Sequence, residues 1–494
     1  MTKNVKKAIV GIAILFSLAI PTTFAQEYPE LGVRVEIIAE NLTIPWSIDW
    51  TPDGKTFFTE RNGNLRIIEN EVLAKEPMMS LEVGGVEGGL LGITVDPNYS
   101  ENNYIYLYYT YNEFLSSSNK VVRYIVDDKE LREDRILIDK IPAGPFHDGG
   151  RILFGPDKKL YITTGEAGNP GLSQDLNSLG GKILRINSDG TVPEDNPFGN
   201  SAIYSIGHRN PQGIDWDESG NLVATEHGPS GLRGVAHDEI NVIIPGANYG
   251  WPDIIGDESA EGLQNPILHS GDDTWAPSGA EFYSGDKIPE WTGKYFVATL
   301  RGSHLHMIDF DLQNNRIVSH QKLFQDEFGR LRDVATGPDG FLYILTSNQD
   351  GRGTPQPGDD RILRISPINN EVNSFDDCVD AGNPVMESYP RKCRTQNGEN
   401  FVEDISEIPS WFKKTAKWWS MTEISDMEFT LAAKYLIQKD IISIPSQITS
   451  ENDSESQIPL WLREDAVRWE EGSLSDDKFA RNIQWMIENE FIKD

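Results

Sequence analysis

The sequence has 494 residues, and 44 Lys and Arg against 77 Asp and Glu give a formal net charge of −33 at pH 7. This length allows several domains and a sizeable core, and 38% apolar residues exclude a disordered or collagen-like chain. Such an acidic chain lacks the basic footprint that broad contact with nucleic acid or an anionic membrane requires, so we expect no nucleic-acid partner.

Residues 1–25 have the pattern of a signal peptide. Lys3, Lys6 and Lys7 form a basic segment before the apolar, uncharged residues 8–20. Thr23-Phe24-Ala25 then offers a cleavage site of the usual kind. The apolar run is shorter than the ~20 residues that span a bilayer, and an uncleaved N-terminal anchor is the alternative. We therefore expect an exported protein, secreted or held at the cell surface.

Residues 31–367 are predicted to be all-β. Turn signals such as Pro52-Asp53-Gly54 and Pro338-Asp339-Gly340 each precede a run rich in Val, Ile, Thr, Tyr and Phe, as in KTFFTER and FLYILTSN. About six such units follow one another at the spacing of propeller blades. The pattern predicts a β-propeller of about six blades; a β-sandwich is the alternative, although it would hardly accommodate so many similar units.

Charged residues recur at similar positions in these units. Arg61, Glu166, Glu226 and Arg301 each follow their turn signal at a similar distance. They should therefore emerge at the same end of equivalent strands, around one rim of the central channel. Such a convergence of charge indicates a functional site.

The composition changes after residue 367. Residues 369–403 are polar and rich in turns, and they contain the two cysteines of the chain, Cys378 and Cys393. Two cysteines exclude a scaffold built from disulfides and a multi-cysteine metal site. In an exported chain the two most simply pair with each other.

Two helical repeats are predicted at the C-terminus, in residues 408–445 and 458–494. Apolar residues recur at helical spacing, and residues of the first segment match residues fifty positions later in the second. We interpret each segment as a small helical pair whose aromatic stripe forms a core, with residues 446–457 as a solvated linker. The matching pairs are Trp411 and Trp461, Trp419 and Trp469, Phe429 and Phe479, and Ile437 and Ile487.

Polar residues gather in four places among the predicted strands. They are residues 144–151 with 164–168, 207–213 with 226–229, 238–241 with 248–252, and 300–302 with 329–333. In the first, His147 is a candidate general base, because histidine titrates near neutrality and a nearby carboxylate can orient its ring.

The other segments offer groups that bind ions. Arginines in the second and fourth segments can hold a polyanion through bidentate hydrogen bonds. Main-chain carbonyls around Gly228-Pro229, and the pair Glu239 and Tyr249, can bind a hard cation such as Ca²⁺. Taken singly, these residues are more often surface ion pairs or loop residues.

In combination, the motifs resemble those of a known family. The motifs GHRNPQG, EHGP, DEIN and NYGWP occur in this order, after Ile44-Pro45-Trp46, Thr59-Glu60-Arg61 and the segment 87–92. Together they resemble the soluble pyrroloquinoline-quinone (PQQ)-dependent aldose sugar dehydrogenases, which are related to the soluble glucose dehydrogenases. The resemblance covers roughly residues 31–367.

The resemblance implies catalytic roles for three residues. His147 would take the proton from the anomeric hydroxyl of the sugar while hydride moves to the quinone. Glu166, at a position where the family often has Asp, would orient His147. Arg209 would stabilise negative charge on the quinone oxygen.

It also implies a cofactor site with two calcium ions. Gly228 and Pro229 would supply main-chain oxygens to a Ca²⁺ at the PQQ site, and Glu239 and Tyr249 match a second, structural Ca²⁺ site. An arginine-rich set suits the three carboxylates of PQQ. The residues that fall where the family contacts PQQ are Glu87, Asn210, Gln212, Arg301, Arg330 and Arg332.

The sequence thus predicts an exported quinoprotein dehydrogenase that oxidises aldose sugars to lactones and needs an external electron acceptor. The absence of a G-x-G-x-x-G motif after a strand argues against a nicotinamide-binding domain. The C-terminal repeats resemble accessory modules of exported archaeal proteins and predict a cell-surface partner. The alternatives are a calcium-dependent lactonase, which would not need the arginines, and a non-catalytic cell-surface binding propeller.

Overall fold

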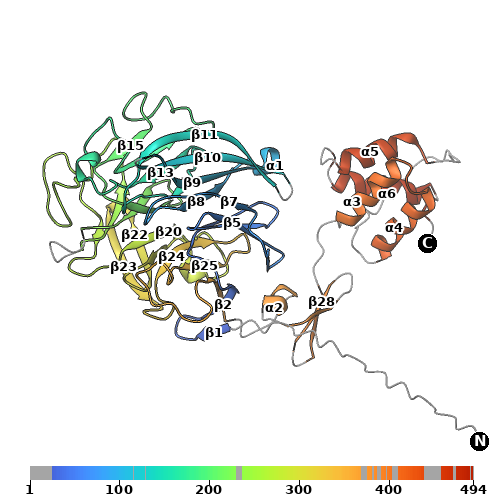
Figure 1. The fold of residues 1–494 in the computed structure, drawn as a ribbon. Coiled ribbons are helices and arrows are strands. Elements are labelled where there is room, and N and C mark those ends of the chain that lie inside the picture. Colours follow the sequence, from blue (N-terminus) through green and yellow to red (C-terminus); the bar gives the residue numbers. More distant parts are fainter. Residues whose placement is uncertain are drawn as a thin grey trace, which may run out of the picture. The chain divides into compact units, whose positions relative to one another are not determined.

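The computed structural model of the chain forms two compact units, residues 1–368 and 369–494 (Figure 1). It describes residues 25–114, 116–127, 130–229, 236–368, 375–380, 383–386, 391–395, 398–402, 410–438, 458–470, 474, 476–489 and 491–492. Residues 1–24 of the predicted signal peptide and the predicted linker 446–457 lie outside the described residues. None of the helices in the described ranges combines the length and apolar character that crossing a membrane requires.

The described part of the first unit contains six antiparallel sheets, which confirms the prediction of an all-β region. Two of them are β3 (Pro45–Trp50), β4 (Thr56–Glu60), β5 (Asn64–Glu69) and β6 (Val72–Leu73) with β7 (Met79–Ser80) paired to β5, and β8 (Leu90–Val95), β9 (Tyr104–Asn112), β10 (Ser117–Asp127) and β11 (Glu130–Pro142). The next are β12 (Ile152–Phe154), β13 (Leu160–Thr164), β14 (Lys182–Ile186) and β15 (Ile203–Ile206), and β16 (Pro211–Trp216), β17 (Leu222–Glu226), β18 (Glu239–Ile243) and β19 (Leu268–His269).

The fifth comprises β20 (Pro277–Phe282), β21 (Tyr295–Thr299), β22 (Leu305–Asp311) and β23 (Arg316–Leu323). The last joins both ends of the unit, since β1 (Ala25–Tyr28) and β2 (Val33–Ala39) pair onto β26 (Ile362–Pro367), β25 (Leu342–Thr346) and β24 (Leu331–Thr336). One helical turn, α1 (Tyr99–Asn102), and three short 3₁₀ segments, at Pro170–Ser173, Pro289–Trp291 and Leu312–Asn314, lie in connections.

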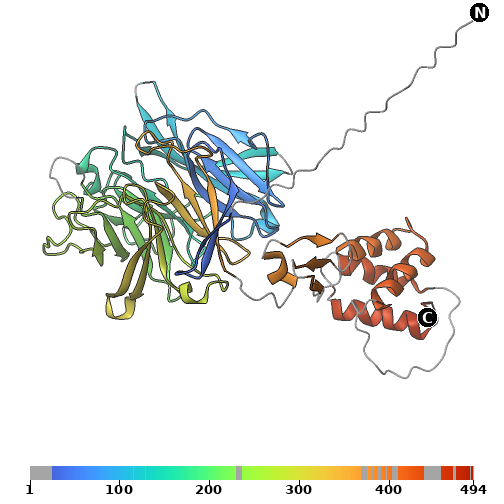
Figure 2. The same ribbon diagram turned by 90° about the horizontal axis from the view of Figure 1, so that it is seen from below.

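The sheets close into a ring. The innermost strand β3 packs on β8, β8 on β12, β16 on β20, β20 on β24 and β24 back on β3. Between the sheets of β12 and β16 the contact is made by β13, which packs on β16. Neighbouring sheets stand side by side in both views (Figures 1 and 2). Their facing sides bury apolar clusters, for example Phe57 and Leu65 against Leu107 and Val122. The unit is therefore a β-propeller whose core lies between successive sheets.

Arg151 joins the inner strands across the channel. Its Nη1 donates to Ser47 Oγ and to Asp333 Oδ2, both at 2.9 Å, and its Nε donates to the main-chain oxygen of Gln212 at 3.0 Å. Its guanidinium also lies 4.5 Å from the ring centroid of Trp46. Because Trp46 and Arg151 line different cavities, this network separates the two ends of the channel.

Four carboxylates line a cavity of about 270 Å³ at one end of the channel. Each accepts a backbone N–H from the next sheet of the ring, so these side chains connect neighbouring sheets: Asp49 from Val95 (2.7 Å), Asp215 from Phe282 (2.6 Å), Glu281 from Thr336 (2.8 Å) and Asp333 from Ile48 (3.2 Å). Burial raises the pKa of Asp49 to about 6 and also raises the pKa of Asp215 and Glu281, which lie close to one another.

These carboxyls predict a propeller that loses stability as pH rises. Their pKa values are higher in the folded protein than the value near 4 of an unfolded chain, so their contribution is complete below about pH 4 and is lost through about pH 6 and above. We expect the Tm to fall between pH 5 and 8, and to fall less in the double variant Asp215→Asn, Glu281→Gln. Calorimetry across this range tests it, with exposed Glu261→Gln as the control, and an unchanged slope in the double variant would contradict it.

The second unit begins with a disulfide-linked segment. Cys378 and Cys393 form the predicted disulfide, with Cα atoms 5.9 Å apart. Both cysteines are buried with Phe375. The segment contains α2 (Phe375–Asp380) and a three-stranded sheet of β27 (Val385–Met386), β28 (Lys392–Arg394) and β29 (Asn400–Val402).

The C-terminal repeats each form a helix pair in the described ranges. The first contains α3 (Ser410–Ser420) and α4 (Asp426–Gln438), and the second α5 (Leu460–Glu470) and α6 (Asp476–Glu488). Trp419 stacks on Phe429 at 4.1 Å, and their counterparts Trp469 and Phe479 stack at 3.8 Å within the same buried cluster. The side chain of Trp411 lies outside the described residues.

The two repeats contact each other reciprocally. Lys413 of the first lies over the ring of Trp469, and its counterpart Arg463 of the second lies over the ring of Trp419. Both repeats thus contribute to one core.

Candidate active site

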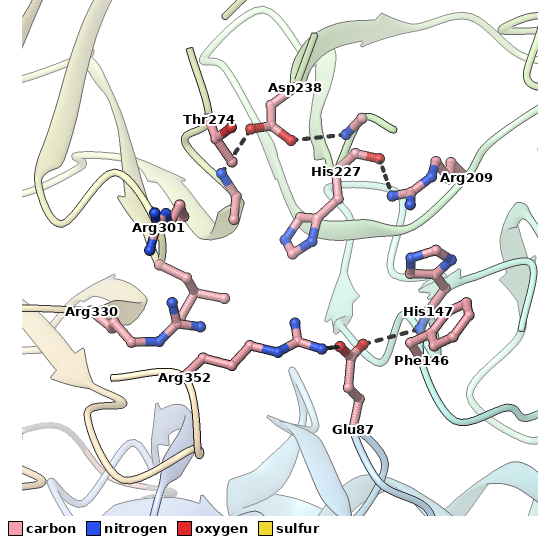
Figure 3. A pocket seen from close by; sticks show the side chains of 13 residues that line it. Glu87, Phe146, His147, Arg209, His227, Asp238, Thr274, Arg301, Arg330 and Arg352 are labelled. Carbon is pink, nitrogen blue, oxygen red and sulfur yellow. Dashed lines mark hydrogen bonds and ion pairs between the residues drawn. The ribbon is translucent and has the colours of Figure 1, made fainter. Parts of the chain in front are cut away.

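A cavity of about 580 Å³ opens at the other end of the channel (Figure 3). It adjoins a cavity of about 70 Å³ lined by Arg61, Gln212 and Arg332, and both cavities are bordered by Glu87, His227 and Arg330. The predicted site residues that line the larger cavity are Glu87, His147, Arg209, Gly228, Arg301 and Arg330.

The turn spacing correctly placed four charges at this end. Arg61, which follows β4, and Arg301, which follows β21, line the two cavities. Glu166, after β13, contacts His147, and Glu226, at the end of β17, accepts the backbone N–H of Arg209. Residues at or just after the ends of the second strands of four sheets therefore lie at one site.

His147 lies in the loop between β11 and β12. Its Nδ1 contacts Oε1 of the buried Glu166, and its ring meets Phe146 edge-on at 4.6 Å. The close approach depends on Gly165, since a Cβ there would lie 2.0 Å from the main-chain oxygen of His147. With Nδ1 donating to the carboxylate, Nε2 carries the lone pair of the ring.

Arg209 is buried close to His147, on the same side of the cavity (Figure 3). Its Nη1 donates to the main-chain oxygen of His227 at 3.1 Å, and its guanidinium lies 5.4 Å from the ring centroid of Trp251. Burial lowers the pKa of Arg209 below its ordinary value, although Glu166 and Glu226 act in the opposite direction. A desolvated positive charge therefore borders the cavity close to the histidine (Figure 3).

Arg330 and Arg332 also line the site. Arg330 directly precedes β24, and Arg332 lies in it. Nε and Nη2 of Arg330 donate to Asp350 Oδ2 at 2.9 and 2.7 Å. Arg332 Nη1 donates to Gln212 Oε1 at 3.1 Å, while its Nε has no partner in the described part of the chain. Burial lowers the pKa of Arg332 to about 9, and the charges of Arg61 and Arg330 act in the same direction despite Asp350.

The site carries surplus positive charge and unused donors. Six arginines line the two cavities, against the four carboxyl groups of Glu87, Asp148, Asp238 and Asp350. Asn210 is buried, and its Oδ1 accepts from Gly149 N at 3.0 Å, but its Nδ2 has no partner among the described residues. Because buried donors are normally satisfied, these features fit an anionic ligand with several acceptor groups. The arginines that line the two cavities are Arg61, Arg209, Arg301, Arg330, Arg332 and Arg352.

The predicted cation ligands lie together beside the larger cavity. Gly228, Pro229, Glu239 and Tyr249 border one small void. Burial, followed by the charge of Glu226, raises the pKa of Glu239. A Cβ at Gly228 would lie 1.8 Å from the main-chain oxygen of Ala236, so several main-chain groups converge there.

The side chain of Tyr249 is occupied elsewhere. Its hydroxyl donates to the main-chain oxygen of Val242 at 2.6 Å and accepts from Ile244 N at 2.8 Å. Within the described ranges, no group of three or more His, Cys, Asp and Glu side chains is placed to hold a metal. A cation here would thus depend on main-chain oxygens, including that of Tyr249, together with carboxylates.

Sequence reasoning gave no role to several lining residues. His227 follows β17, its Nε2 has no partner in the described part, and burial lowers its pKa well below the ordinary value, so the ring is neutral. Asp350 and Arg352 lie in the loop after β25, the second strand of its sheet. The turn counting that located Arg61 could have indicated this loop too.

Comparison with known proteins gives consistent matches. A family model described as glucose/sorbosone dehydrogenase matches residues 42–363. The aldose sugar dehydrogenase of Escherichia coli is 31% identical over 365 residues, which cover 68% of this chain and 94% of that protein. Quinoprotein glucose dehydrogenase B of Acinetobacter calcoaceticus is 31% identical over 324 residues, 57% of this chain and 66% of its own. The PQQ-bound structure of an aldose sugar dehydrogenase from Streptomyces coelicolor shares 36% identity at a TM-score of 0.61, covering 68% of this chain and 98% of its own.

Proposed function

Because this chain belongs to the glucose/sorbosone dehydrogenase family, we propose that it is a PQQ-dependent dehydrogenase that oxidises aldose sugars at the anomeric carbon to lactones. The observation that carries the proposal is the His147–Glu166 contact at the edge of an arginine-lined cavity of about 580 Å³. A lactonase has no need of this surplus of arginines, and a binding propeller has no need of an oriented histidine.

The residues present fit PQQ, whose three carboxylates match the surplus guanidinium charge. The unused Nδ2 of Asn210 and Nε of Arg332 are donors that such a ligand would satisfy. When bound, PQQ supplies the two-electron acceptor that protein side chains lack. The residues that would hold it are Glu87, Asn210, Gln212, Arg301, Arg330 and Arg332.

In the proposed reaction His147 acts as the general base. Nε2, the ring nitrogen that does not contact Glu166, takes the proton from the anomeric hydroxyl of the sugar. Glu166 holds the ring orientation and stabilises the imidazolium that forms. Arg209, desolvated close to His147, stabilises the negative charge that develops as the hydrogen leaves the sugar.

We assign calcium to two places beside this site. Main-chain oxygens of Gly228 and Pro229 would hold a Ca²⁺ that acts as a Lewis acid, and Glu239 with the main-chain oxygen of Tyr249 would hold a structural Ca²⁺. The assignment is supported by geometry, since Gly228, Pro229, Glu239 and Tyr249 border the same small void.

Removing calcium should therefore abolish dye reduction. After treatment with a chelator of calcium and dialysis, we expect activity to fall to background and to return with Ca²⁺ added together with PQQ. The rate of dye reduction measures the loss and recovery of activity. Mg²⁺ is the control cation, because it is seldom bound by a site made of main-chain oxygens. Full activity after complete removal of calcium, verified by elemental analysis, would contradict the assignment.

We also propose export through residues 1–25 and a cell-surface partner for the C-terminal repeats. The disulfide of Cys378 and Cys393 supports an oxidising compartment. Deletion of residues 404–494 in the native host is expected to release the protein from the cell surface. Unchanged surface retention would remove the partner proposal.

The central experiment is dye reduction by the purified chain with Ca²⁺ and PQQ across a panel of aldoses. We expect sugar-dependent reduction and stoichiometric binding of the quinone, followed by absorbance. A failure to bind the quinone would overturn the dehydrogenase and favour the binding propeller. Hydrolysis of a lactone without dye reduction would favour the lactonase.

A further inference from the structure

His147 has an unusual backbone conformation for a residue with a side chain. Its φ is +67°, in the left-handed region that costs a non-glycine residue roughly 1 kcal/mol. Two hydrogen bonds hold it. Its main-chain oxygen accepts from Ala167 N at 3.0 Å, and its N–H donates to Glu87 Oε2 at 3.1 Å. The acceptor of the second bond is the side chain of Glu87, which lies in the loop before β8.

Glu87 is in turn held by Arg352. The guanidinium of Arg352 pairs with Oε1 of Glu87, the oxygen that does not accept from His147 (Figure 3). One carboxylate thus connects an arginine from the loop after β25 to the backbone of the histidine. The carboxylate cannot rotate toward solvent without breaking both contacts.

The backbone of Arg352 is held by Asp350. Its backbone N–H donates to Asp350 Oδ1 at 2.9 Å, and Oδ2 of Asp350 accepts from Arg330. The side chain of Arg352 is 65% exposed, so it is no buried counterion that the fold requires. An exposed ion pair of this kind contributes little to overall stability, but it restrains the groups that it joins.

We propose that Arg352 is a positioning residue for His147 and acts through Glu87. It keeps the Glu87 carboxylate where the His147 N–H can donate to it, and so maintains the left-handed backbone that points the ring at the cavity. The catalytic meaning of this arrangement rests on the proposed function. The physical restraint does not, because every contact involved is within the chain.

Hydrogen exchange of the protein without cofactor or sugar tests the restraint directly. Mass spectrometry of peptides covering residues 143–151 reports exchange of the His147 amide, whose rate follows local opening. We expect Arg352→Gln to raise this rate two- to fivefold, and Arg352→Lys, which keeps the charge, to restore most of the protection. Arg316→Gln, an exposed arginine in another ion pair, is the control and should change nothing.

A double variant separates positioning from a general loss of structure. In a Glu87→Gln background, Arg352→Gln should have no further effect on exchange, because the carboxylate through which it acts is gone. Unchanged exchange in Arg352→Gln, or an equal increase in the Glu87→Gln background, would overturn the proposal.

Kinetics of the loaded enzyme give a second readout. We expect Arg352→Gln to lower kcat severalfold with KM for the sugar and the affinity for PQQ within about twofold of the original. A weakened affinity for PQQ with normal hydrogen exchange would instead make Arg352 a cofactor ligand and overturn positioning. If the wild-type chain oxidises no sugar, the proposed function fails while the exchange result still decides the role of Arg352.

Discussion

Replacing His147 by alanine is expected to lower kcat/KM for an aldose by about 10²- to 10⁴-fold, the usual contribution of a positioned general base. The residual activity reflects binding and the charge of Arg209, which the substitution leaves in place. The base in the proposed reaction is Nε2, the ring nitrogen that does not contact Glu166. None of the contacts described above places another side chain where it could accept the proton instead. Dye reduction under saturating PQQ and Ca²⁺ measures the loss.

Two controls make the result specific. Affinity for PQQ, followed by absorbance, should stay within a fewfold of wild type, because the arginines that suit its carboxylates are unchanged. His320→Ala removes an exposed histidine of β23 and should leave the rate unaltered. A His147→Ala variant that keeps more than a tenth of the wild-type rate would exclude this residue as the base.

Replacing Arg151 by methionine is expected to destabilise the propeller by about 3–5 kcal/mol, the range seen when one partner of a buried ion pair is removed. The side chains of Arg151 and Asp333 are only 8% and 4% exposed, and their contact measures 2.9 Å. Methionine fills much of the volume but leaves the buried carboxyl group of Asp333 without its ionic partner. Urea unfolding followed by near-ultraviolet circular dichroism measures the loss.

The exposed ion pair of Arg316 with Asp311 provides the matched control, and Arg316→Met should cost at most about 1 kcal/mol. Adding Asp333→Asn to Arg151→Met should recover part of the stability, because the carboxyl group left without its partner is then removed. Equal unfolding midpoints for Arg151→Met and Arg316→Met would show that the network across the channel contributes no more than a surface contact.

The hairpins of the propeller were predictable because their signals are local. Pro52-Asp53-Gly54 lies between β3 and β4, and Pro338-Asp339-Gly340 lies between β24 and β25. In both cases turn residues separate two short runs of β-branched and aromatic residues. The same local counting placed Arg61 and Glu166 at one end of the channel.

Contacts across the ring were not predictable in this way. Arg151 and Asp333 are 182 residues apart, and no local pattern links an arginine just before one inner strand to a carboxylate on another. The neutral state of His227 depends on burial, which a motif does not report. The tyrosine at position 249 was expected beside a cation, but that its hydroxyl is engaged with Val242 and Ile244 follows only from the three-dimensional arrangement.

The sheet that joins β2 to β26 also determines the order in which the ring can be completed. Arg34 and Ser366, whose side chains meet in this sheet, are 332 residues apart, whereas most other strands pair with their immediate neighbour in the chain. A ribosome makes β2 early, and its edge stays without a partner until β26 has been synthesised. The last pairing therefore carries the largest loss of chain entropy and sets a slow final step. Until that step, an unpaired strand edge is open to other chains, so the propeller is most prone to aggregation just before it closes.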